Sequence, residues 1–274
     1  MKKILVPTDF SIQAENALKL AAQLALKNNL EIHLLHIMEI PNQMSDAITG
    51  ATPIPDIMFF IQKAKETLRF TKEKDYLKDL IIIDSIKMEK ASTGILSYID
   101  ENNIDLVLMG SNGVSGIEEI IIGSNTEKVV RRSSAPVIVI KEEIPVFNPQ
   151  NIVFASDFSE EIKKPFLKIL DFVNLFDAKL NLVTICTPNS FKTTAVARKI
   201  MQEFTSGFDI KNFSTHIYND SNIEKGIINF SKEINADLIS FCTHGRTGLS
   251  HFFTGSISED LANHALKPLI IFKI

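Results

Sequence analysis

The sequence predicts an α/β fold of two similar domains, each a parallel sheet covered by helices on both faces. Short apolar segments alternate with amphipathic segments of helical period along the whole chain. Apolar segments such as residues 152–154 and 269–271 lack the polar alternation of a strand with one face in water, so they suit buried parallel strands. The chain also repeats itself, and its 274 residues suffice for two domains of ordinary size.

The repeat is found by comparing the chain with itself. Residues 6–11 (VPTDFS) return as residues 154–159 (FASDFS), 148 positions further on (157 minus 9). Residues 136–140 (PVIVI) return as residues 268–272 (PLIIF), at an offset of 132. The second copy is therefore 16 residues shorter (148 minus 132), and the deficit lies where copy one has a proline-rich stretch from Pro41 to Pro55. We expect this stretch to act as a flap over copy one.

The linker between the copies carries two prolines and three charged residues. It divides the chain into domain 1, residues 1–143, and domain 2, residues 149–274. In domain 1 the periodicity predicts strands over residues 3–7, 32–37, 80–86, 106–109 and 137–140, with a helix behind an N-cap at Ser11 and further helices over 56–79, 93–102 and 124–133. In domain 2, Pro165 predicts a late or kinked start of the first helix.

Glycines follow the fourth strand of copy one, at the sheet edge where open parallel sheets bind ligands. Gly110 and Gly113 come directly after the strand, and Gly123 with Ser124 opens the next helix. Glycine lets backbone N–H groups approach a phosphate closely, and a helix N-terminus adds unpaired donors. An alternative needs no ligand: Ser124 and Glu127 have the spacing of a capping box.

These residues resemble the universal stress protein family, whose nucleotide-binding members carry the motif G-2x-G-9x-G-(S/T). The resemblance covers both copies, so the chain resembles a tandem member. It implies two doubly wound sheets with strand order 3-2-1-4-5, which pair through their last strands as an intramolecular pseudo-dimer. It also implies a nucleotide across strands one and four, with Asp9 near the adenine or ribose and Ile37 beside the base. The implied binding residues are Pro7, Thr8, Asp9, Ile37, Met109, Gly110, Gly113, Gly123, Ser124, Asn125 and Thr126.

Copy two departs from the motif at Cys242, which stands where the first glycine belongs. A side chain there either narrows the cleft or forbids backbone angles that glycine supplied. We therefore expect copy two to bind nucleotide weakly or not at all, through the retained Asp157, Gly245, Gly255 and Ser256. The charges of the loops instead favour phosphate binding by copy two, because copy two has Arg246 and His251 where copy one has Glu118 and Glu119. The expected cofactor is ATP, with Mg²⁺ as a candidate companion beside those two carboxylates.

Other chemistry finds little support. Cys242, His244, His251 and His264 fit no zinc spacing, so we expect no metal site. No nucleophile and base recur in both copies, and no P-loop is present, so we expect no catalytic residues and at most slow ATP hydrolysis. The expected function is that of a nucleotide-binding stress regulator. The alternatives are a slow ATP hydrolase and a scaffold without bound nucleotide.

Composition limits the possible partners. The net charge of −4 gives no reason to expect nucleic acid as a partner. No apolar run approaches the roughly 18 residues needed to cross a bilayer, and the N-terminal residues do not read as a signal peptide, so we expect a cytoplasmic location without membrane contact. The predicted partners are an adenine nucleotide and unidentified proteins. The chain is expected to be a monomeric pseudo-dimer or a homodimer.

Overall fold

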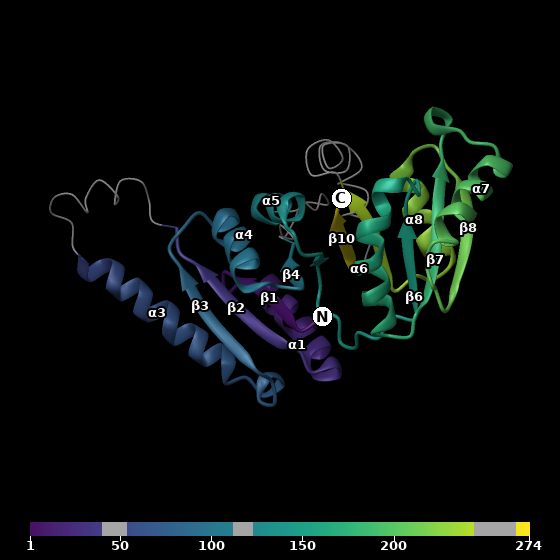
Figure 1. Cartoon of the computed structure of the whole chain (residues 1–274). Helices are drawn as coiled ribbons and strands as arrows, with labels where there is room; N and C mark the ends of the chain where they lie inside the picture. The colour runs from purple at the N-terminus through teal and green to yellow at the C-terminus, as the bar shows by residue number, and fades with distance from the viewer. Residues whose placement is uncertain (40–53, 112–122, 244–266) are drawn as a thin grey trace.

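The computed structural model describes residues 1–39, 54–111, 123–243 and 267–274. Within these residues, ten strands form one continuous sheet in the order β3-β2-β1-β4-β5-β10-β9-β6-β7-β8 (Figure 1). Each copy contributes five parallel strands in the order 3-2-1-4-5. The predicted α/β class and strand order are confirmed, and the two five-stranded sheets prove to be halves of a larger one.

Copy one follows the predicted alternation closely. Its elements are β1 (Lys3–Thr8), α1 (Ile12–Asn28), β2 (Glu31–Ile37), α3 (Ile54–Lys72), the 3-10 turn η1 (Asp75–Leu77), β3 (Ile82–Lys87), α4 (Ala91–Asn102), β4 (Leu106–Gly110), α5 (Ser124–Arg132) and β5 (Val137–Ile140). The helix predicted over residues 56–79 ends early, at Lys72. The chain turns there because Leu77 packs into the core and the Tyr76 hydroxyl donates to Glu15 Oε1 at 2.6 Å.

Copy two differs mainly at its first helix. Its elements are β6 (Asn151–Ala155), η2 (Glu160–Ile162), α6 (Lys163–Asn174), β7 (Lys179–Cys186), η3 (Pro188–Ser190), α7 (Thr194–Thr205), β8 (Phe213–Asn219), α8 (Ile223–Glu233), β9 (Leu238–Thr243) and β10 (Leu269–Lys273). The late helix start predicted from Pro165 is confirmed, since a 3-10 turn precedes α6. Pro165 lies in the first turn of α6, where its missing N–H would have no helical partner.

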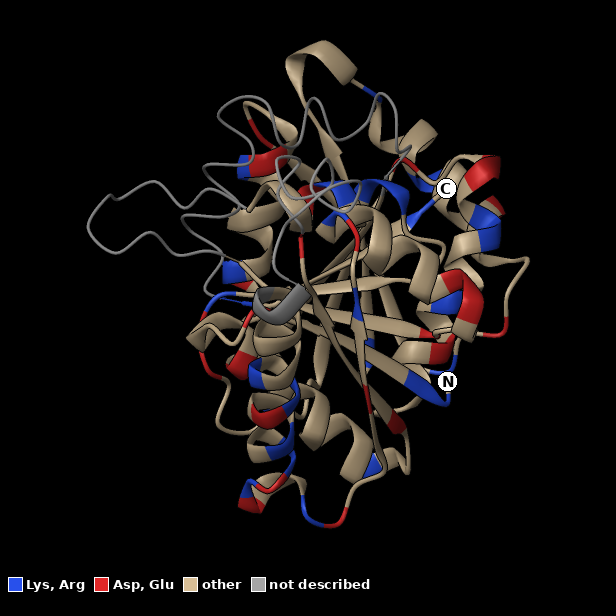
Figure 2. Ribbon diagram, turned by 90° about the vertical axis from the view of Figure 1, so that its left-hand side faces the viewer, with Lys and Arg blue, Asp and Glu red and all other residues tan. Residues whose placement is uncertain are grey.

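Apolar side chains cover both faces of the sheet. Along β1, Ile4 and Val6 join one buried cluster and Leu5 joins the other, because successive residues of a strand point to opposite faces. Helices α1, α3, α6 and α7 contribute to the first cluster, and α4, α5 and α8 contribute to the second. Figure 2, which looks from the β3 end, shows basic and acidic residues interspersed along the helices and loops around the sheet.

Strands β5 and β10 join the two copies as an antiparallel pair. Ile138 lies opposite Ile270 at its centre, and both side chains are buried. The linker is also held against α1, because Gln23 Nε2 donates to the Ile144 carbonyl and Gln23 Oε1 accepts from Phe147 N, both at 2.7 Å. The predicted pairing through the last strands is therefore present, and the linker packs along copy one.

Two repeated polar residues have structural roles. Asn103 adopts the left-handed conformation at the C-terminus of α4, as Asn235 does after α8. Asp105 Oδ2 accepts from the backbone N–H groups of Lys2 and Lys3, and Asp237 Oδ2 accepts in the same way from the start of β6. Part of the sequence repeat therefore reflects caps and strand starts, not a ligand.

We expect Ile270→Ala to lower the free energy of unfolding by about 2–5 kcal/mol, as deletion of a buried isoleucine side chain usually does. Because Ile270 packs at the seam of a continuous sheet, the urea midpoint of the whole chain should fall in one cooperative transition, followed by circular dichroism. Val146→Ala in the exposed linker is the control and should change stability by less than about 0.5 kcal/mol. Two separate transitions, with only one of them shifted, would contradict coupling through this seam.

Candidate functional site

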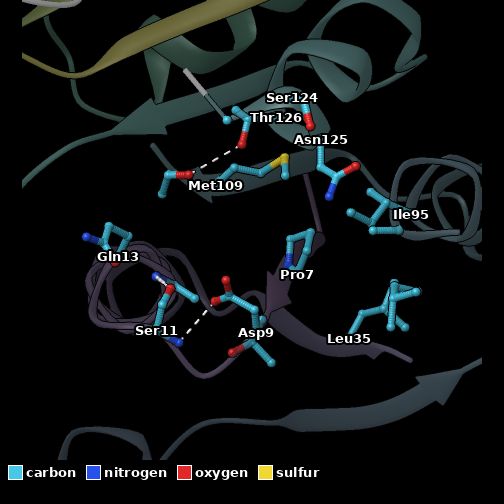
Figure 3. A pocket seen from close by; sticks show the side chains of 16 residues that line it. Pro7, Asp9, Ser11, Gln13, Leu35, Ile95, Met109, Ser124, Asn125 and Thr126 are labelled. Carbon is cyan, nitrogen blue, oxygen red and sulfur yellow. Dashed lines mark hydrogen bonds between the residues drawn. The ribbon is translucent and has the colours of Figure 1, made fainter. Parts of the chain in front are cut away.

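A pocket in copy one opens at the carboxyl ends of β1 and β4 (Figure 3). The starts of α1 and α5 close two of its sides, and Ile95 of α4 closes another. Ten of the predicted residues line it: Pro7, Thr8, Asp9, Ile37, Met109, Gly110, Gly123, Ser124, Asn125 and Thr126. Gly113 lies outside the described residues, as does the proposed flap except for residues 54–55, which begin α3.

The pocket is also lined by six residues that the sequence did not indicate as site residues: Ser11, Gln13, Ala14, Leu35, Ala91 and Ile95. Ala91 and Ile95 lie one turn apart at the start of the helix that follows the third strand. The repeat contained an indirect indication, because Gly94 lets α4 lie against Ile37. A Cβ at Gly94 would be 2.8 Å from Ile37 Cδ1, and Gly226 faces Ile185 in the same way in copy two.

Hydrogen bonds fix the turn that carries Asp9. Asp9 Oδ1 accepts from Ser11 N at 3.0 Å, and Thr8 Oγ1 accepts from Phe10 N at 3.0 Å. Phe10 takes a left-handed φ of 64°, which is uncommon for a residue other than glycine. Ser11 then caps α1 by accepting from Ala14 N at 3.2 Å, as predicted. One oxygen of the Asp9 carboxylate is thus committed to the turn.

The corresponding turn in copy two has the same geometry. Asp157 Oδ1 accepts from Ser159 N at 3.1 Å, and Phe158 has a φ of 60°. Asp9 and Asp157 therefore share one structural role. Any difference between the two sites must come from the residues around the turn, not from the turn itself.

The start of α5 forms one wall of the pocket. Gly123 is the N-cap and Ser124 the first helical residue, with no side-chain cap among the described residues. The capping box considered for Ser124 is therefore wrong, and Glu127 instead pairs with Arg131 at 3.4 Å. Thr126 Oγ1 donates to the Gly110 carbonyl at 3.4 Å, which ties the helix start to the end of β4. Backbone N–H groups in an uncapped first turn are suitable donors for an anion.

Gly110 is required by the close approach of α1. A Cβ at this position would lie 2.5 Å from the carbonyl carbon of Gln13 and 2.7 Å from its Cβ. The φ of Gly110 lies outside the left-handed region, so backbone angles are not the reason for glycine here. A side chain at this position was expected either to narrow the cleft or to forbid the backbone angles of glycine. The structure instead shows a steric clash of the side chain with α1.

Copy two accommodates a side chain at the equivalent position. Cys242 stands there, and Glu161, the counterpart of Gln13, lies in the 3-10 turn η2 instead of a regular helix. The 3-10 turn that delays the start of α6 therefore contains Glu161, whose counterpart in copy one leaves no room for a Cβ on Gly110. A cavity of about 370 Å³ remains, compared with about 180 Å³ for the pocket of copy one, so Cys242 does not close it.

The copy-two cavity is lined by bulkier apolar groups. Where copy one has Ala14, Ala91, Met109 and Gly110, copy two has Ile162, Ile223, Phe241 and Cys242. Burial, with a smaller contribution from the Asp157 carboxylate, raises the pKa of Cys242 to about 12. The thiol is therefore neutral at physiological pH and resembles a small apolar side chain. Of the predicted second-site residues, Gly245, Gly255 and Ser256 lie outside the described residues.

Metal and membrane chemistry gain no support from the described part of the chain. No cluster of three or more His, Cys, Asp or Glu side chains suited to a metal ion occurs there. His244, His251 and His264 fall in the undescribed range. Among the described helices, none combines the length and hydropathy of a membrane span.

Comparisons with known proteins agree on one family. The sequence model of the universal stress protein family matches residues 1–141 and again residues 149–273. Universal stress protein Slr1230 of Synechocystis is 21% identical over the full length of both chains. Universal stress protein MJ0577 of Methanocaldococcus jannaschii is 29% identical, and the match covers 52% of this chain and 96% of that protein. The crystal structure of a universal stress protein from Archaeoglobus fulgidus superposes with a TM-score of 0.77 at 22% identity, over 99% of this chain and 98% of the other.

We expect Gly110→Ala to lower the free energy of unfolding by about 1–3 kcal/mol, because α1 must move to admit the new Cβ. Urea unfolding of the full chain measures the change. Gly207→Ala is the matched control, since a Cβ there would lie 3.6 Å from the Phe204 carbonyl oxygen, in ordinary contact. Equal stability of the two variants would show that the close approach of α1 to β4 is not a constraint.

We expect the Cys242 thiol to react slowly with a disulfide reagent in the folded chain. A pKa of about 12 leaves about 2,000-fold less thiolate at pH 8 than an ordinary pKa of about 8.5 does. The rate is measured on a Cys186→Ser variant, so that a single thiol reports, and compared with the same chain in urea. Similar rates in both states would contradict the partial burial of this side chain.

Proposed function

The chain belongs to the universal stress protein family, and we propose that its first copy binds an adenine nucleotide while the second binds it weakly or not at all. One observation carries the proposal. Ten of the binding residues that the family resemblance implied, which come from the motif, the turn after β1 and the end of β2, line one pocket at the carboxyl ends of β1 and β4. This edge, where the strand order reverses, is where open parallel sheets bind ligands.

The pocket divides into an apolar part and a polar part. Leu35, Ile37 and Ile95 offer an apolar surface suited to a base. Asp9 lies across Pro7 from Leu35 and Ile95 in Figure 3, and its carboxylate can accept from ribose hydroxyls or the adenine amine. The enclosed volume of about 180 Å³ is smaller than the roughly 300–1,000 Å³ of typical small-molecule sites, so it suits the nucleoside end. We propose that the phosphates extend along the first turn of α5, where backbone N–H groups can donate.

Binding without efficient turnover fits the chemistry of the lining. Asp9 is the single ionisable side chain among the described residues that line the pocket. No described lysine or arginine there can neutralise the charge that develops during phosphoryl transfer. We therefore propose a regulatory role in the stress response, in which nucleotide occupancy of copy one changes how the chain interacts with partner proteins. ATP, with or without Mg²⁺, is the proposed ligand.

The bulkier lining of copy two supports the asymmetry. Phe241 and Cys242 replace Met109 and Gly110 at the carboxyl end of the fourth strand of the copy, where the ribose and phosphates would pass. Ile223 replaces Ala91 at the opposite wall. Because the turn around Asp157 matches that around Asp9, these replacements are the features that we propose weaken nucleotide binding.

We expect Asp9→Asn to weaken ATP binding by about 10- to 100-fold, since a hydrogen bond to a charged group contributes about 1.5–3 kcal/mol. The asparagine keeps the turn, because its side-chain oxygen can still accept from Ser11 N. Isothermal titration of the full chain measures affinity and stoichiometry, with about one site per chain expected.

Asp157→Asn is the matched control for this experiment, because Asp157 makes the same turn in copy two. It should leave ATP affinity unchanged. A loss with Asp157→Asn but not with Asp9→Asn would reverse the assignment of the two copies. No binding to the unaltered chain at millimolar ATP would instead favour the scaffold without nucleotide.

A further inference from the structure

A second cleft in copy one lies beside the pocket but shares no lining residue with it. It is bounded by α3, the end of β2 and the segment between β3 and α4, and its volume is about 520 Å³. Its apolar lining comes mainly from Phe10, Met38, Ile57, Phe60, Ala64 and Met88. The volume is typical of small-molecule sites, and every residue named here belongs to the described part of the chain.

The duplicated fold provides an internal reference for this cleft. Phe10 and Phe158 occupy the same position of the same turn and share the left-handed backbone conformation. Phe158 is only 4% exposed, because Phe204 of α7 packs against it with ring centroids 5.2 Å apart. Phe10 is 36% exposed and lines the cleft. In copy two, Phe204 thus covers the ring of Phe158. In copy one, the equivalent ring of Phe10 faces the cleft.

Copy one surrounds the exposed ring with further aromatic surface. Phe10 stacks on His36 with centroids 4.5 Å apart and an interplanar angle of 29°. His36 Nδ1–H donates to the Thr8 carbonyl at 2.8 Å, which fixes the plane of the imidazole. Phe60 of α3 is half exposed at the same cleft. These groups present flat, preorganised surfaces to an aromatic guest, which favours offset or edge-to-face packing.

A lysine at the cleft is available to pair with an anion. Lys63 lines the cleft, and it makes no ion pair with any described residue, whereas Arg69, Lys72 and Lys74 further along the chain each pair with a carboxylate. Among the described residues that line the cleft, Glu39 is the one acidic side chain, and its Oε1 accepts from Ala91 N at 2.7 Å, which directs the carboxylate to the start of α4. We propose that this cleft binds a small aromatic molecule that carries an anionic group, with the ring against Phe10 and Phe60 and the anion at Lys63.

The proposal is independent of nucleotide binding in the neighbouring pocket, and its test keeps the two apart. Titration calorimetry of the full chain compares 1-naphthoate with neutral 1-naphthalenemethanol, each with and without saturating ATP. We expect the carboxylate to bind at least about tenfold more tightly than the alcohol, and ATP to leave its binding stoichiometry unchanged. Complete displacement of naphthoate by ATP would place the probe in the nucleotide pocket and overturn the proposal.

Two variants locate the probe. Lys63→Gln should remove the preference for the carboxylate over the alcohol, while Lys65→Gln, on the same helix but outside the cleft, should preserve it. Ala64→Phe should fill the cleft and abolish binding of both compounds, with Val196→Phe on the exposed surface of α7 as its control. Unchanged naphthoate affinity in both Lys63→Gln and a folded Ala64→Phe would overturn the proposal, as would no binding to the unaltered chain. Because Lys63 is exposed, Lys63→Gln is expected to fold. It therefore tests the proposal even if Ala64→Phe misfolds.

Discussion

The antiparallel pair of β5 and β10 is the interaction on which the arrangement of the molecule depends. Each is the last strand of its copy, apolar on both faces, and would expose unpaired backbone groups if the copies were separate. Their pairing covers both edges and extends the two buried clusters across the seam. Because the pair is antiparallel, the carboxyl ends of the strands point in opposite directions in the two copies. The copy-one pocket and the copy-two cavity therefore open at opposite edges of the sheet.

The two copies use the same frame differently. Copy two fills one face with phenylalanines that pack edge to face, among them Phe158, Phe166 and Phe204. Larger side chains also surround the cavity at its strand ends. Copy one has small residues, Gly110 and Ala91, at its strand ends, and an exposed Phe10 beside them. This difference fits the proposed division, in which copy one binds nucleotide and copy two binds it weakly or not at all. The covalent linker keeps the effective concentration of the pairing between the copies high.

Much of the site was predictable because its residues follow strands at fixed spacing. Apolar runs locate the strand ends, and the residues just beyond them in a parallel sheet must meet at one edge. Other parts were not predictable. Ser124 and Glu127 have the spacing of a capping box, yet Gly123 is the N-cap and Ser124 is already the first helical residue. Thr126 is hydrogen-bonded to the Gly110 carbonyl. The role of Gly110 was also hidden, because the atoms that exclude a Cβ belong to Gln13, almost a hundred positions away in the sequence.

The sequence by itself determined the duplication, the α/β class, the late start of α6 and the gathering of the motif residues at one sheet edge, because periodicity, proline and repeat offsets are local properties. Only the tertiary structure decided that the copies share one sheet and that Cys242 coexists with an open cavity. It also showed that Phe10 faces a cleft while Phe158 is buried by Phe204. The physical reason is that burial and close approach depend on which helix lies over a residue, and the Asp-Phe-Ser sequence shared by the two turns is covered by different neighbours.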